Sequence, residues 1–105
     1  MLSHEFTPPA LAEINTNLEG LLHTSEENAD LNDEKMSVAL KLVNMRCSFI
    51  DSYLRDEQIK DKQSFIEKEL LSQKYLEALF AGLRDTTQQT LAQLKRARRD
   101  IKKFG

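Results

Sequence analysis

The chain is poor in the residues that interrupt helices and in those that form disulfides. It has 105 residues but only two prolines and three glycines, so few tight turns are available. This scarcity favours long helices and disfavours an all-β fold with its many turns. The single cysteine, Cys47, has no second cysteine to pair with, which suits a reducing compartment. The length predicts one domain, residues 1–105.

The sequence also lacks the features of membrane and secreted proteins. No apolar run approaches the length of about 18 residues that a membrane-spanning helix needs. The first residues, Met1 to Glu5, lack the basic start and apolar core of a signal peptide. We therefore expect a cytoplasmic protein without a membrane span.

Lysine and arginine are absent from residues 1–34, which hold eight acidic residues. Residues 93–105 show the opposite bias, with six basic residues and one acidic residue, although the net charge of the whole chain is only −2. An acidic head and a basic tail either pack against each other or face different partners.

What the chain does have is helical periodicity of its apolar residues. Residues 1–6 show none and are expected to be disordered. Thr7-Pro8-Pro9 is typical of a helix start, which predicts a first helix over about 8–24. A heptad pattern of apolar residues predicts a second helix over about 33–54. A third stripe, without any proline, predicts one long helix over about 61–103.

The long helix would leave part of its apolar face uncovered. It would extend roughly 65 Å, whereas the second helix would extend only about 33 Å. The second helix could therefore cover the long helix only from Asp61 to about Leu83. The stripe from Leu79 to Leu94 is therefore interpreted either as ordinary core or as an association site, which exposed apolar patches usually mark. A break near Gly82, with both halves enclosed by the chain itself, would remove this argument.

The predicted fold is all-α: a three-helix antiparallel bundle, or a helical hairpin, with one long C-terminal helix. Two positions stay open for the first helix. It can lie beside the second helix, or it can lie along the tail half of the long helix, where its acidic residues would face the basic ones.

The residues of an enzyme site are not recognisable. No CxxC, HExxH, GxxxxGK or GxGxxG motif is present. His4 lies in the segment expected to be disordered, His23 is interpreted as a polar helix terminus, and Cys47 as a small core residue on the heptad seam. We predict no catalytic, cofactor-binding or metal-binding residues, no cofactor and no enzymatic activity.

Two surfaces are candidate binding sites. The first is the apolar face of the long helix, and its predicted partner-binding residues are Leu76, Leu79, Phe80, Leu83, Thr87 and Leu91. The second is the basic tail, made of Lys95, Arg96, Arg98, Arg99, Lys102 and Lys103. Cations at a helix C-terminus suit the helix dipole, and the tail has only one accompanying aromatic residue, so nucleic acid is the less favoured partner.

The run Leu76–Arg84, the segment Thr90–Leu94 and the closing Ile101-Lys102-Lys103-Phe104-Gly105 together resemble the C-terminal half of FliT-type flagellar export chaperones. Met45–Ile50 resembles an arginine followed by an apolar pair in the second helix of that family. The resemblance covers about residues 36–105. Two differences are that the family's tryptophan in the first connection is absent, and that the chain stops where some members continue into a further helix that masks the binding groove.

The resemblance implies a small type III export chaperone that holds an amphipathic segment of an unassembled secretion substrate, typically the filament-cap protein, in a hydrophobic groove. It also implies contacts with the export machinery or a transcription regulator. Two other hypotheses stay open. One is a homodimeric, coiled-coil-like structural adaptor, and the other is a helical regulator that contacts nucleic acid through its basic tail.

Overall fold

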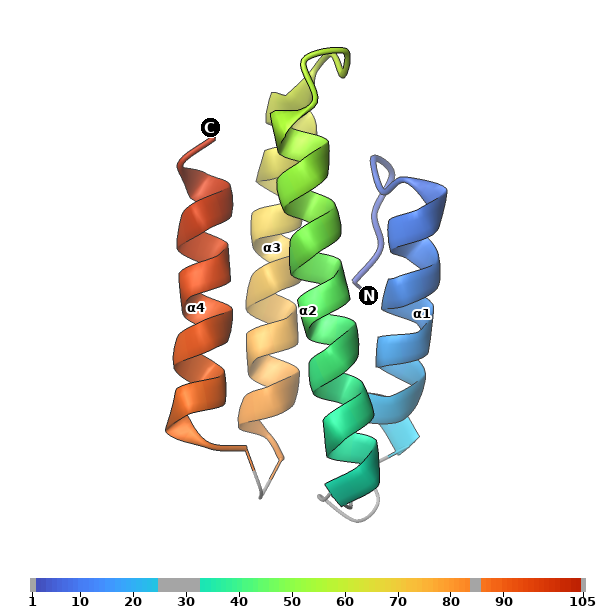
Figure 1. The fold of residues 1–105 in the computed structure, drawn as a ribbon, viewed down its shortest axis with the longest axis vertical. Coiled ribbons are helices and arrows are strands. Elements are labelled where there is room, and N and C mark those ends of the chain that lie inside the picture. Colours follow the sequence, from blue (N-terminus) through green and yellow to red (C-terminus); the bar gives the residue numbers. More distant parts are fainter. Residues whose placement is uncertain (1, 25–32, 84–85, 105) are drawn as a thin grey trace.

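The computed structural model describes residues 2–24, 33–83 and 86–104. Within these residues the chain forms four helices and no strand: α1 (Pro9–Thr24), α2 (Asp33–Arg55), α3 (Lys62–Ala81) and α4 (Gln88–Lys102). The helices lie side by side with alternating directions, in a bundle of 42 × 25 × 18 Å (Figure 1). None of them is long and apolar enough to cross a membrane. The all-α class is thus confirmed, whereas the predicted number of helices is not.

The single helix predicted over 61–103 is wrong, because the chain turns back between α3 and α4. Gly82 ends α3, and the backbone N–H of Leu83 donates to the carbonyl of Phe80 across 3.0 Å. Thr87 then has extended backbone angles, φ −87° and ψ 159°, and its hydroxyl accepts from the N–H of Thr90 at 3.1 Å. This is an N-cap, which starts a new helix. Instead of one long rod, the chain forms an antiparallel α3–α4 pair (Figure 1).

The first helix takes one of its two expected positions. α1 packs beside α2, and α4 lies at the opposite edge of the bundle (Figure 1). The alternative, with the first helix along the basic tail, is therefore wrong. As a consequence, α1 and the basic residues of α4 lie at opposite edges of the bundle. The connection over 25–32, which includes most of the predicted link between the first two helices, lies outside the described residues.

The interior contains two apolar clusters separated by a polar layer. The first cluster holds Leu2, Leu18, Leu22, Ala39, Val43, Leu76, Phe80, Leu83 and Leu94. The second holds Leu11, Ile50, Leu54, Phe65, Ile66 and Ile101. Four buried polar residues, Asn15, Arg46, Glu69 and Gln73, fall between these clusters along α1, α2 and α3. Each of these three helices thus has apolar, polar and apolar turns in succession on its inner face.

The N-terminal segment from Leu2 packs against this interior. This corrects the expectation that residues 1–6 are disordered, apart from Met1, which lies outside the described residues. Leu2 is completely buried in the first cluster. Its backbone N–H donates to Glu19 Oε1 at 2.8 Å, and its carbonyl accepts from the Ser72 hydroxyl at 2.7 Å. Ser3 Oγ lies 3.1 Å from Asn15 Nδ2, from which it accepts a hydrogen bond. One leucine side chain and several hydrogen bonds therefore hold the segment in place. Helical periodicity cannot reveal these contacts.

Replacing Leu2 with alanine should lower the free energy of unfolding by about 2 kcal/mol or more, as for other buried leucines. The neighbouring variant Phe6→Ala is the control, because Phe6 is 38% exposed and its loss should change stability by no more than about 0.5 kcal/mol. Urea denaturation followed by circular dichroism measures both. Equal stability of the two variants would show that the segment contributes nothing to the core.

Candidate functional site

The predicted partner-binding residues do not form one open surface. Leu76 and Phe80 are completely buried and Leu83 is 9% exposed, all three in the first apolar cluster. Leu79 and Leu91 are partly buried against the same cluster. Thr87 is exposed and caps α4. The chain itself therefore covers most of this stripe, and the argument from an uncovered long helix no longer holds.

The polar layer is centred on Arg46, whose side chain is 1% exposed. Its Nε donates to Asn15 Oδ1 at 2.9 Å and its Nη1 to Gln73 Oε1 at 2.7 Å. Its Nη2 forms an ion pair with Glu69 Oε1, and that carboxylate is completely buried. Gln73 Nε2 also donates to the carbonyl of Leu94 at 3.2 Å. One guanidinium thus links three helices directly and the fourth through Gln73.

The electrostatics of the layer keep a cation inside the bundle. Burial lowers the pKa of the Arg46 guanidinium, and the charge of Glu69 acts in the opposite direction. His4 closes the network from the N-terminal segment. Its Nδ1 accepts from the N–H of Phe6 at 3.2 Å, so Nε2 carries the proton and donates to Glu69 Oε2 at 2.9 Å. With these partners the layer joins the helices together.

A signal for this layer is present in the sequence. Asn15 is four residues after Leu11 and three before Leu18, so it occupies a position on the apolar stripe. Arg46 likewise lies on an apolar stripe, three residues after Val43 and four before Ile50. Polar residues at stripe positions point to a buried polar network, because buried charges need partners.

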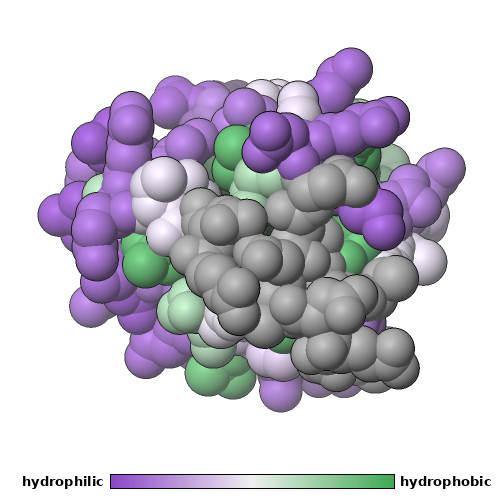
Figure 2. All heavy atoms as spheres, turned by 90° about the horizontal axis from the view of Figure 1, so that it is seen from below, coloured by the Kyte–Doolittle hydropathy of each residue, from purple (hydrophilic) through white to green (hydrophobic). Residues whose placement is uncertain are grey.

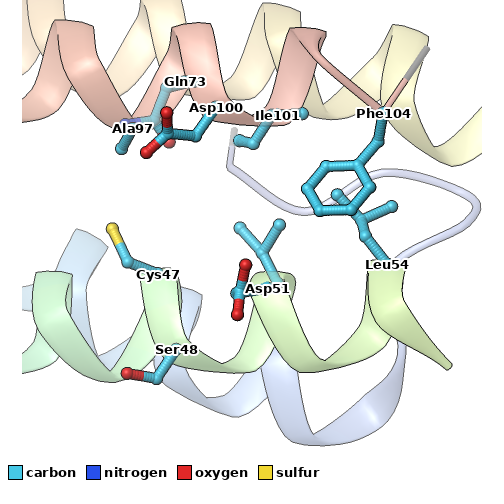
Figure 3. Close-up of a pocket in the computed structure, with 10 residues that line it drawn as sticks. Cys47, Ser48, Asp51, Leu54, Gln73, Ala97, Asp100, Ile101 and Phe104 are labelled. Carbon is cyan, nitrogen blue, oxygen red and sulfur yellow. The ribbon is translucent and has the colours of Figure 1, made fainter.

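An open groove lies between α2 and α4, with a volume of about 320 Å³. Its lining residues are Cys47, Ser48, Ile50, Asp51 and Leu54 of α2, Gln73 of α3, and Ala97, Asp100, Ile101 and Phe104 of α4 and its C-terminal end. Figure 3 shows Cys47 pointing from α2 towards α4, and Asp100 pointing from α4 into the gap. The groove is therefore apolar along its floor and acidic on both sides.

The sides of the groove carry weakly held charges. The Asp51 carboxylate accepts from Arg55 Nε at 3.0 Å, and both side chains are more than half exposed. Asp100 lies 3.6 Å from Lys103 Nζ, again with both side chains exposed. Exposed ion pairs of this kind contribute about 0–1 kcal/mol to stability. A cation of a binding partner can therefore replace Arg55 at Asp51 or Lys103 at Asp100. At the end of the groove Phe104 is 40% exposed, with the Arg55 guanidinium carbon 5.7 Å from its ring centroid.

The Cys47 thiol in this groove is not activated. Burial raises the pKa of Cys47, and nearby Asp100 raises it further, while the positive charge of Arg46 opposes both effects. The thiol therefore stays protonated at neutral pH, and the thiolate is the nucleophilic form. This agrees with the interpretation of Cys47 as a packing residue, although it is half-buried at the groove and not enclosed in the core.

The basic residues lie along α4 and just beyond its end. Lys95, Arg96, Arg99, Lys102 and Lys103 are exposed, whereas Arg98 is partly buried and its Nε lies 3.1 Å from Glu77 Oε2 of α3. The tail is thus brought together as one surface, with Arg98 serving the contact between α3 and α4.

Comparisons with family models, with curated proteins and with solved structures find no match to this chain. Two residues of the FliT-like pattern, Arg84 and Gly105, lie outside the described part of the structure. Within the described part, no group of three or more histidine, cysteine, aspartate or glutamate side chains is placed to hold a metal ion.

Proposed function

We propose that this protein is a small, non-enzymatic helical chaperone or adaptor that binds an amphipathic segment of a protein client in the groove between α2 and α4. The observation that carries the proposal is the groove itself, which leaves apolar side chains of two helices open between polar ones. A concave site that combines apolar side chains with a few polar groups is typical of binding sites.

The size and charge of the groove define its occupant. A volume of about 320 Å³ is at the lower end of the range for ligand pockets, so it takes one or two bulky apolar side chains and not a whole helix. Asp51 and Asp100, on opposite sides, complement a lysine or arginine next to those side chains. We therefore assign the site to a client helix whose apolar residues lie about one turn from a basic residue.

The resemblance to FliT-type proteins supports a more specific function. It favours a cytoplasmic type III export chaperone whose client is an unassembled, filament-cap-like flagellar protein. The client site differs from the stripe first expected, because Leu76 and Phe80 lie in the core, whereas Ala97, Ile101 and Phe104 of the same resembling segment line the groove.

The groove is tested with variants at its exposed edge. In Phe104→Ala and Asp51→Lys, the dissociation constant for the filament-cap protein of the same organism should rise about tenfold or more, because each removes one of the groove's contacts. Leu71→Ala is the matched control, since Leu71 is a 63% exposed leucine on α3 outside the groove. Isothermal titration calorimetry measures all three.

Occupation of the groove has a second readout in Cys47. Bound client should slow the alkylation of this thiol in the wild-type protein and leave it unchanged in Phe104→Ala. If the cap protein does not bind at all, the export-chaperone proposal fails. If it binds and only Leu71→Ala weakens it, the client site is on α3 and the groove is not the site.

A further inference from the structure

The outer face of α4 carries a continuous row of cations. Lys95, Arg99 and Lys102 follow each other at steps of four and three residues, and Arg96 and Lys103 flank the row at the same steps from Arg99. All five are exposed. Between residues 95 and 103 the face extends about 12 Å along the helix. The edge of the molecule on which α4 lies is mainly hydrophilic when seen from below (Figure 2).

These cations are not used to hold the fold together. Among the ion pairs of the described residues, α4 is attached to α3 by Arg98, and Lys103 has only the 3.6 Å contact with Asp100. Leu94 and Ile101 anchor the helix from its opposite face, where they are 1% and 5% exposed. Helix-dipole stabilisation accounts for cations in the last turn, but Lys95 and Arg96 lie before it.

The composition of the face distinguishes between its potential partners. Stable protein interfaces have an apolar core and are depleted in lysine, whereas this face has no apolar side chain larger than that of Ala92. A membrane-surface helix needs a free apolar face, and that of α4 lies in the core. Single-stranded nucleic acids are bound by stacking on aromatic side chains, and none stands in the row. Interfaces with duplex nucleic acid are polar and cationic.

We propose that the outer face of α4 binds the phosphates of double-stranded nucleic acid without reading its sequence. A duplex carries one negative charge per about 1.7 Å of its axis, so a stretch as long as this face holds about seven phosphate charges, counted over both strands. The surface adjoins the α2–α4 groove at Lys103, which lies 3.6 Å from the groove residue Asp100, whereas Ala97 and Ile101 face the groove from another side of the helix. The inference does not depend on the client-binding proposal.

The test uses a fluorescently labelled, mixed-sequence duplex DNA of about 20 base pairs, with binding followed by anisotropy. With four phosphate contacts, raising the salt from about 50 to about 200 mM should weaken binding about 150-fold. Lys95→Glu/Arg99→Glu should weaken binding at the lower salt at least about tenfold and should reduce the logarithmic salt slope by about two. Circular dichroism confirms that the helices persist.

The matched control is Lys41→Glu/Lys68→Glu, on exposed positions of α2 and α3. It changes the net charge by the same amount and should leave more of the affinity intact than the α4 variant. Equal losses in the two variants, or no binding of the duplex at the lower salt, would overturn the proposal. Tighter binding to single strands or to anionic phosphatidylglycerol vesicles would also overturn it. Phe104→Ala should not affect DNA binding, which separates this result from the groove test.

Discussion

Replacing Arg46 with methionine is expected to lower the free energy of unfolding by about 3–5 kcal/mol, a large part of the stability of a small domain. Methionine fills much of the same space but leaves the Glu69 carboxylate completely buried without its cation. The amide groups of Asn15 and Gln73 also lose their donors. Urea denaturation followed by circular dichroism measures the change.

Two further variants separate the network from general effects of charge. Arg96→Met removes an exposed arginine and should change stability by no more than about 0.5 kcal/mol. The double variant Arg46→Met/Glu69→Leu should be more stable than Arg46→Met alone, because an apolar pair can replace a buried ion pair at little cost. A single variant as stable as the wild type would mean that Arg46 does not join the helices.

Replacing Phe80 with aspartate should unfold the protein. Phe80 is completely buried in the first apolar cluster. Truncation of a buried phenylalanine costs about 3–5 kcal/mol, and burial of an unpaired carboxylate adds to this. Far-ultraviolet circular dichroism at about 25 °C detects the loss of helix, and gel filtration detects the loss of the compact state.

The exposed neighbour Ala78 provides the control. Ala78→Asp places the same charge on the outer side of α3 and should cost only about 0.5–1 kcal/mol through helix propensity. A folded Phe80→Asp variant that had lost client binding would contradict this assignment. It would restore the interpretation of Phe80 as part of a partner surface.

Helical periodicity was sufficient to predict the helical class and most of the element bounds, but not the turn after α3. The apolar stripe keeps the same phase across that turn, since Leu94 and Ile101 follow Leu83 by about three and five whole helical turns. The local signals were Gly82 and the N-cap residue Thr87, which end one helix and begin another. With the turn in place, the face expected to be bare is covered by the chain itself.

The candidate site was less accessible from the sequence, because it depends on which helices become neighbours. Ala97, Ile101 and Phe104 line the groove only because α4 folds back and lies near α2. Similarly, Arg46 and Glu69 are far apart in sequence and become partners only when α2 and α3 pack together. Burial of Leu2 is a tertiary effect of the same kind.

The fold-back of α4 is the feature on which the groove depends. Spin labels at Glu77→Cys and Arg98→Cys, in a Cys47→Ser background, measure it directly by electron paramagnetic resonance. The wild-type side chains of these two positions approach to 3.1 Å, so we expect dipolar broadening from labels less than about 20 Å apart. A separation of about 31 Å, the length of 21 residues of continuous helix, would show that α3 and α4 form one rod and would contradict the fold described above.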